Sequence, residues 1–138
     1  MPVRFHWRDG MAEQRLKAFE NEQYLNLETY RKNGTAIGTP VWFAEQDGVL
    51  YIYSVADAWK VKRIRNNPKV RIAPCGIRGE VKGDWVEATA RIVTGAEEDR
   101  AQALLTKKYG WMKKIGALYS RLIGRAHAAI AITASPKT

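Results

Sequence analysis

The segment that decides the fold is residues 51–70, which read YIYSVADAWKVKRIRNNPKV. Around its start, residues 49–55 alternate with the period of a β-strand, and both faces of that strand are largely apolar. A short run rich in lysine and arginine follows. It stops at Pro68, which disfavours helix at the residue before it, and another strand begins there. The segment therefore predicts a strand that leads directly into a short basic helix and then into a second strand.

The start of this basic helix is a candidate anion site. Ser54 precedes Asp57 by three residues, the spacing of a capping box, which predicts a helix start near Val55. Free backbone N–H groups at a helix N-terminus favour an anion, and Lys60 and Lys62, about one turn further on, strengthen that preference. The alternative is a basic helix that faces water, which is what runs of charge usually do.

Composition sets the class of protein and of partner. The chain has 138 residues, which predicts a single domain over residues 1–138. Its formal net charge of +9, from 23 basic and 14 acidic residues, favours phosphate-bearing cofactors, polyanionic tails or nucleic acid as partners. The single cysteine, Cys75, excludes an internal disulfide and a cysteine metal cluster, and it fits a reducing cytoplasm. No apolar run resembles a signal peptide or approaches the ~20 residues that span a membrane, so we expect a cytoplasmic protein without membrane contact.

The whole chain predicts six strands with flanking helices. Asn33 and Gly34 form a strong hairpin signal, and Pro40 places its strand at a sheet edge or at a bulge. A capping box at residues 94–97 predicts a helix that ends at Gly110. The expected strands cover residues 24–31, 36–44, 49–55, 69–75, 84–93 and 127–133, and further helices are expected at residues 11–21 and 111–123.

The order of these elements favours a mainly β fold. The first three strands should form a meander. Six strands joined mostly by antiparallel hairpins indicate a closed or nearly closed barrel, because closure removes exposed edges. A doubly wound parallel sheet would need a regular alternation of strands and helices, which the chain lacks.

The side chains offer few groups for acid–base or nucleophilic catalysis. No Gly-rich phosphate loop and no nucleophile elbow is present. His6 and His127 stand alone, so we expect no metal site. If the protein is an enzyme, a bound cofactor should therefore supply the chemistry, while the protein supplies position and electrostatics.

Two sequence features together resemble a known family. Residues 38–43 read GTPVWF, and after a turn and a strand residues 60–70 read KVKRIRNNPKV. This order resembles the split-barrel flavin-binding proteins related to pyridoxamine 5′-phosphate oxidase, and more narrowly the branch of probable deazaflavin (F420)-dependent enzymes. The resemblance covers about residues 24–93. It implies a six-stranded antiparallel split β-barrel of the FMN-binding type, usually a homodimer with two cofactors at the subunit interface.

The resemblance also implies which residues bind the cofactor. Lys60 would hold the cofactor phosphate with help from Lys62, and the polar strand residues Thr29 and Arg31 would face the same site. The backbone of the second strand would lie along the ring system, and the end of the third strand would line the junction; these residues are Pro40, Val41, Trp42, Ser54 and Val55.

Each of these assignments has a plainer alternative. Thr29 can be an ordinary polar strand residue, Trp42 a core residue and Arg31 a solvated strand end. Asp57 departs from the family pattern, because an acid near a phosphate is repulsive unless the helix cap uses it.

The implied function is an oxidoreductase that binds F420 or FMN and passes a hydride or electrons to a small-molecule substrate. The family's dedicated residues for pyridoxamine phosphate are not recognisable, so that activity is not predicted. One alternative is a basic barrel that binds nucleic acid, with Trp or Tyr stacked on bases, although we expect no nucleic acid partner. Another is a relative that binds flavin or haem without turnover.

Overall fold

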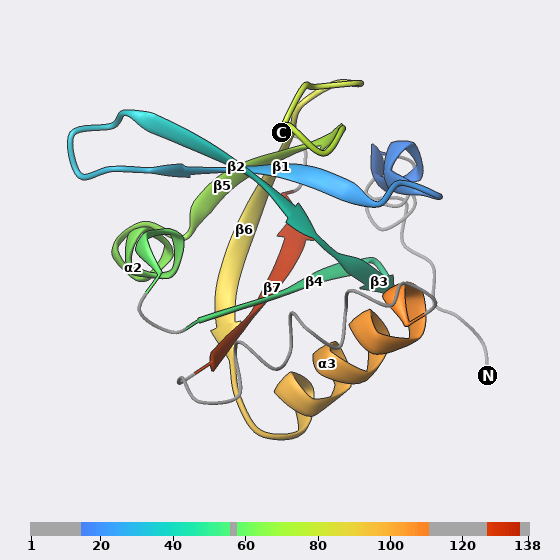
Figure 1. Ribbon diagram of the computed structural model, residues 1–138. Helices are drawn as coiled ribbons and strands as arrows, with labels where there is room; N and C mark the ends of the chain where they lie inside the picture. The colour runs from blue at the N-terminus through green and yellow to red at the C-terminus, as the bar shows by residue number, and fades with distance from the viewer. Residues whose placement is uncertain (1–14, 56–57, 111–126, 136–138) are drawn as a thin grey trace.

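The computed structural model describes residues 15–55, 58–110 and 127–135, and within them the chain forms one curled antiparallel sheet with flanking helices (Figure 1). The sheet has seven strands in the order β2-β1-β5-β6-β7-β4-β3. Their bounds are β1 Tyr24–Tyr30, β2 Ala36–Trp42, β3 Ala44–Gln46, β4 Val49–Val55, β5 Lys69–Cys75, β6 Val86–Val93 and β7 His127–Ala134. The described helices are the 3-10 turn η1 Lys17–Phe19 and the α-helices α2 Trp59–Asn66 and α3 Ala96–Tyr109.

The curl of the sheet follows from the position of β2 and β3. These two strands lie at opposite ends of the strand order, yet only Phe43 separates them in the chain. The two edges of the sheet must therefore approach each other at this residue, which confirms the predicted antiparallel split barrel.

The number of strands differs from the prediction because residues 36–44 do not form one strand. The backbone of Phe43 bonds to side chains of α3 instead of continuing a ladder. Its N–H donates to Tyr109 Oη at 3.1 Å, and its carbonyl oxygen accepts from Lys108 Nζ at 2.8 Å and lies 2.9 Å from Tyr109 Oη. The sheet consequently has seven strands rather than six.

The same break makes the predicted meander wrong. β2 pairs along its length with β1, whereas β3 pairs with β4, so the first two hairpins are joined only at Phe43. The prediction for Pro40 is confirmed: it lies in the edge strand β2, opposite Asn26 of β1. The hairpin at Gly34, whose φ is +89°, is also confirmed.

The core lies inside the curl. On β1 the inward side chains Leu25, Leu27 and Thr29 are at most 1% exposed, as the alternation predicted. Ile130 and Ile132 of β7 are fully buried in the same apolar cluster. A smaller cluster joins β3 to α3.

Two predicted helix starts are wrong in detail. α2 begins at Trp59 with Ala58 as its N-cap, not near Val55, and its cap makes no side-chain hydrogen bond. The reason is that β4 continues to Val55, where it still pairs with β7, so Ser54 is a strand residue opposite Ala128. Asp57, the proposed partner in the capping box, lies outside the described residues.

The predicted capping box of α3 does not form either. Gly95 is the N-cap, with φ +67° and no side-chain cap bond. The Glu97 carboxylate instead accepts from both Arg91 terminal nitrogens, at 2.9 and 2.8 Å, and from Tyr51 Oη at 3.1 Å. The predicted end of this helix at Gly110 is confirmed.

Some predicted elements fall on undescribed parts of the chain. The helix expected over residues 111–123 lies outside the described residues, as do residues 11–14 of the one expected over residues 11–21. The described part of that segment contains only short helical structure, with the 3-10 turn η1 at Lys17–Phe19. Among the residues that are described, no helix has the length and apolar character to cross a membrane.

Candidate functional site

The basic helix α2 is fixed on the barrel by its apolar side chains. Val61 and Ile64 are buried in the core, and α2 contacts β1 and β6. At the C-terminal end, the Asn67 N–H donates to Arg63 O at 2.8 Å, and Asn67 Oδ1 accepts from Lys69 N at 3.1 Å. With one face anchored in this way, the charged side chains are held on the remaining faces of the helix.

A cleft of about 460 Å³ lies between α2 and the end of the β1–β2 hairpin. Small-ligand sites are commonly about 300–1,000 Å³. The cleft is lined by Tyr30, Arg31, Lys32, Trp59, Lys62, Arg63 and Asn66. Two of the predicted site residues, Arg31 and Lys62, therefore meet in one cavity, although they are far apart in the chain.

Arg63 is the main residue of this cleft that sequence reasoning did not assign to the site. Its Nε donates to Thr29 Oγ1 at 2.6 Å, and Thr29 is fully buried. Burial lowers the pKa of Arg63, and the positive charge of Arg31 lowers it further. The sequence feature that could have pointed to Arg63 is Thr29. This polar residue lies on the inward apolar face of β1, and a buried hydroxyl needs a hydrogen-bond partner.

Lys60 does not line the cleft, but it precedes Arg63 by three residues on α2, the spacing at which helix side chains are neighbours. It is half-buried. Burial lowers the pKa of Lys60, and the charge of Arg63 lowers it further, so the two cations are close enough to repel. None of the ion pairs found in the described part of the chain involves either residue. The helix thus holds partly desolvated positive charge that has no carboxylate partner among the described residues.

Trp59 and Lys62 form the outer edge of the cleft. Trp59 is 70% exposed, and Lys62 Nζ lies 4.6 Å from the centroid of its ring. This arrangement presents a flat aromatic face and an ammonium group to whatever enters the cleft.

The predicted residues of β2 and β4 are not among the described residues that line this cleft. Val41 packs against the core, and the Trp42 ring stacks on Tyr109 with centroids 4.7 Å apart and an interplanar angle of 11°. The Trp42 side chain thus packs against α3, and the prediction that backbone along residues 40–42 contacts a ring stays a prediction. Ser54 is buried within β4, and Val55 is the last residue of that strand.

The contact between Arg63 and Thr29 gives a first prediction. We expect the two side chains to contribute a coupling energy of about 1–2 kcal/mol to folding, because Arg63→Met leaves the buried Thr29 hydroxyl without its donor. In a Thr29→Val background no hydroxyl remains, so Arg63→Met should cost less. Urea unfolding of the four proteins in this double-mutant cycle measures the coupling. An equal loss in both backgrounds would contradict the assignment.

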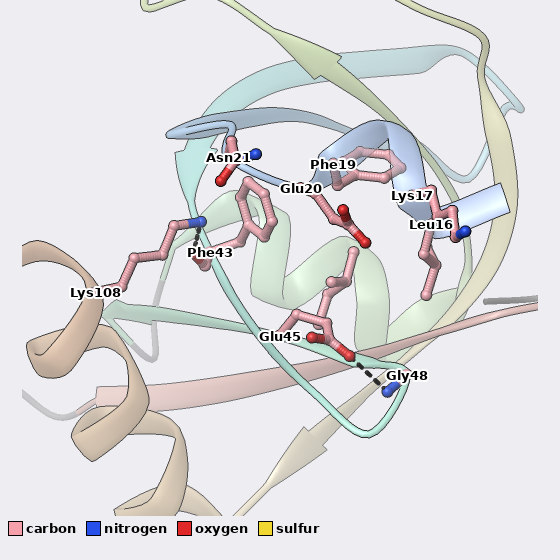
Figure 2. A pocket seen from close by; sticks show the side chains of 10 residues that line it. Leu16, Lys17, Phe19, Glu20, Asn21, Phe43, Glu45, Gly48 and Lys108 are labelled. Carbon is pink, nitrogen blue, oxygen red and sulfur yellow. Dashed lines mark hydrogen bonds between the residues drawn. The ribbon is translucent and has the colours of Figure 1, made fainter. Parts of the chain in front are cut away.

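A second cavity, of about 500 Å³, lies beside η1 and α3 (Figure 2). In the view of Figure 1, α2 lies at the left, whereas η1, β3 and the C-terminal end of α3 lie at the right. Lys108 of α3 lines this cavity, and its Nζ lies 3.6 Å from the centroid of the Phe43 ring. Burial lowers the pKa of Lys108 to about 8, although the carboxylate of Glu22 acts in the opposite direction.

The Lys108 ammonium should make stability depend on pH. The folded-state pKa of about 8 lies below the ordinary value of 10.5, so between these values the unfolded chain binds a proton that the folded chain has lost. The free energy of unfolding of the wild type should therefore rise from pH 8 to pH 10.5 by an amount that Lys108→Met lacks. Urea unfolding of both proteins at about pH 7.5 and about pH 10 tests this expectation. A difference between the two proteins that is the same at both pH values would contradict it.

Comparison with known proteins adds a family to this geometry. The sequence model of the family described as pyridoxamine 5′-phosphate oxidase matches residues 11–135. No curated protein matches the chain.

Several solved structures share the fold. The haem storage protein HutZ of Vibrio cholerae has a TM-score of 0.64 at 16% identity, with 91% of this chain and 92% of that chain covered. An FAD-binding protein of Mesorhizobium loti has a TM-score of 0.58 at 19% identity, with 90% and 87% covered. An F420-H2 dependent reductase has a TM-score of 0.58 at 19% identity, with 80% and 93% covered. At these identities the similarity shows the fold alone.

Proposed function

Because this chain belongs to the pyridoxamine 5′-phosphate oxidase family, we propose that it is a cytoplasmic oxidoreductase that binds FMN or F420 and acts on a small-molecule substrate. The observation that carries the proposal is the group of cations around α2. Arg31, Lys62 and Arg63 line one cleft, and Lys60 lies within electrostatic reach of Arg63. Together they form a site for a phosphate at the place where the family signature lies in the sequence.

The residues present fit a cofactor phosphate. Lys60 and Arg63 are partly desolvated and have no carboxylate partner among the described residues, so an anion that approaches them relieves repulsion as well as forming new bonds. Arginine and lysine supply charge-assisted hydrogen bonds to phosphate oxygens, which are stronger than neutral ones. When bound, the flavin or deazaflavin ring supplies hydride or electron transfer.

The chain's own residues would then act by binding and orientation. Lys60 and Lys62 hold the phosphate, and Arg63, which is fixed through Thr29, adds a positioned guanidinium. Arg31, the residue after β1, adds a fourth positive charge. The backbone of residues 40–42 and the end of β4 at Ser54 and Val55 would border the ring.

A homodimer with the cofactor between the subunits is part of the proposal. The exposed indole of Trp59 at the edge of the cleft supports it, because a large exposed aromatic beside a ligand site is a suitable contact for a second subunit.

The named relatives favour this cofactor class over the alternatives. One is an F420-H2 dependent reductase and another an FAD-binding protein, whereas HutZ is a haem storage protein. Haem binding without turnover is therefore the second candidate. A nucleic acid function has the net charge of +9 and the exposed Trp59 in its support.

Absorption and fluorescence titrations test the proposal. The purified protein, titrated separately with FMN, F420 and haem, should bind FMN or F420 saturably, with one site per subunit. Saturable binding of haem, with no binding of FMN or F420, would favour haem binding without turnover. Salt-sensitive binding to single-stranded nucleic acid that saturating flavin leaves unchanged would favour the nucleic acid reading.

A further inference from the structure

The cavity beside η1 has a floor of aromatic and aliphatic side chains. Phe19 and Phe43 meet edge to face, with ring centroids 6.0 Å apart and an interplanar angle of 84°. Leu16 and Leu50 line the same space, and all four residues are buried, at most 7% exposed. Figure 2 shows Leu16, Phe19 and Phe43 around the cavity, with η1 above and α3 at the side. A flat apolar ring is the kind of group that such a floor accommodates.

The charges around this cavity balance. Lys17 and Lys108 line it together with Glu20 and Glu45. The Glu45 carboxylate accepts the Gly48 N–H at 2.8 Å, so the β3–β4 turn uses it. An anionic ligand would meet the Glu20 carboxylate and a cationic ligand would meet the two lysines. An uncharged ligand avoids both repulsions.

Lys108 is the reactive group of the cavity. Its Nζ is held at 2.8 Å from Phe43 O and lies over the Phe43 ring. A neutral amine can make the same hydrogen bond with one N–H and keep its lone pair free. With a pKa of about 8, roughly a quarter of the Lys108 side chains are neutral near pH 7.5, against about one in a thousand for an ordinary lysine. Burial of this kind activates lysine amines toward carbonyl compounds.

We propose that this cavity is a second ligand site, separate from the cleft beside α2, which takes a small uncharged aromatic aldehyde and holds it as an imine on Lys108. The Lys108 nitrogen attacks the carbonyl carbon, a C–N bond forms, and the carbonyl oxygen leaves as water with the two protons of the amine. No oxidant or reductant takes part. When the imine nitrogen takes up a proton from water, it carries one N–H, which can be donated to Phe43 O.

Reductive trapping tests the site directly. The full chain is treated with benzaldehyde and sodium cyanoborohydride near pH 7.5, and the modified lysines are identified by peptide mass spectrometry. Lys108 should be labelled roughly tenfold faster or more than Lys107, its exposed neighbour on α3. Lys108→Arg should remove this rapid label, whereas the matched variant Lys107→Arg should retain it. Labelling of Lys108 at the same rate as Lys107, or more slowly, would overturn the proposal.

A protection experiment on the unmodified sequence separates a binding cavity from mere amine reactivity. Benzyl alcohol has the same ring but no carbonyl group, so it should slow the labelling of Lys108 and leave that of Lys107 unchanged. Rapid labelling of Lys108 that benzyl alcohol does not slow would refute the cavity as a ligand site. Saturating FMN should have no effect on either rate, so the result is independent of the cofactor proposal.

Discussion

Lys60→Gln should weaken binding of the flavin or deazaflavin cofactor while leaving the cofactor-free protein at least as stable as the wild type. The loss of one charge-assisted contact to phosphate is expected to cost about 1.5–3 kcal/mol, which corresponds to roughly a 10- to 150-fold rise in the dissociation constant. The apo protein should not lose stability, because Lys60 is half-buried and repelled by Arg63, with no carboxylate partner among the described residues. Equilibrium titration and urea unfolding measure the two quantities.

Two variants with the same change of charge calibrate this result. Lys107→Gln alters an exposed lysine of α3, away from α2, and should leave the affinity unchanged. Lys62→Gln alters an exposed lysine at the edge of the cleft and should have an intermediate effect, below about 1 kcal/mol. If Lys60→Gln and Lys107→Gln had the same affinity as the wild type, Lys60 would not be a phosphate ligand.

Tyr109→Phe should cost about 2–4 kcal/mol of unfolding free energy. The Tyr109 hydroxyl lies where the two edges of the sheet meet, and it is buried. The hydroxyl oxygen accepts a hydrogen bond from Phe43 N at 3.1 Å and lies 2.9 Å from Phe43 O. Its hydrogen is donated to Gln23 O at 2.6 Å. Its removal leaves the buried Phe43 N–H without this acceptor, and the break between β2 and β3 loses its support. Urea unfolding of the two proteins measures the difference.

Tyr53→Phe is the matched control for this prediction. It removes the same atom from a half-buried residue of β4, whose hydroxyl lies 3.5 Å from Glu98 Oε2. Its loss should be smaller than that of Tyr109→Phe, because a half-buried hydroxyl is more accessible to water than a fully buried one. Equal losses in the two variants would show that the Tyr109 hydroxyl does not have the special role at Phe43 that the structure assigns.

The sequence predicted the strands better than it predicted their ends. The alternation of Leu25, Leu27 and Thr29 gave the inward face of β1 correctly, and Pro40 gave an edge strand correctly, because both signals are local. The break at Phe43 was missed, since it depends on Tyr109 and Lys108, more than sixty residues away in the chain. The capping box at Ser54 failed because pairing with β7 extends β4 as far as Val55, where the helix was expected to start.

The candidate site was predicted only in part, because its cations are visible in the local sequence but their arrangement depends on the fold. The basic character of α2 is visible in residues 60–65, and its contact with β1 follows from the fold. Which cations share a cleft depends on the rotation of the helix, which its buried residues Val61 and Ile64 determine. That rotation places Lys62 and Arg63 in the cleft with Arg31 and puts Lys60 outside its lining. A pattern of charge alone does not distinguish these positions.

The central claim is that cations of α2 bind the phosphate of a redox cofactor, and one thermodynamic cycle tests it most directly. The affinities of FMN and of riboflavin, which lacks the phosphate, are measured for the wild type and for Lys60→Gln, and the same is done with F420 and its phosphate-free deazaflavin. For the ring type that binds, we expect the phosphate to improve affinity tenfold or more in the wild type, and most of that gain to disappear in Lys60→Gln. A phosphate gain that is absent in the wild type, or that is unchanged in the variant, would contradict the account.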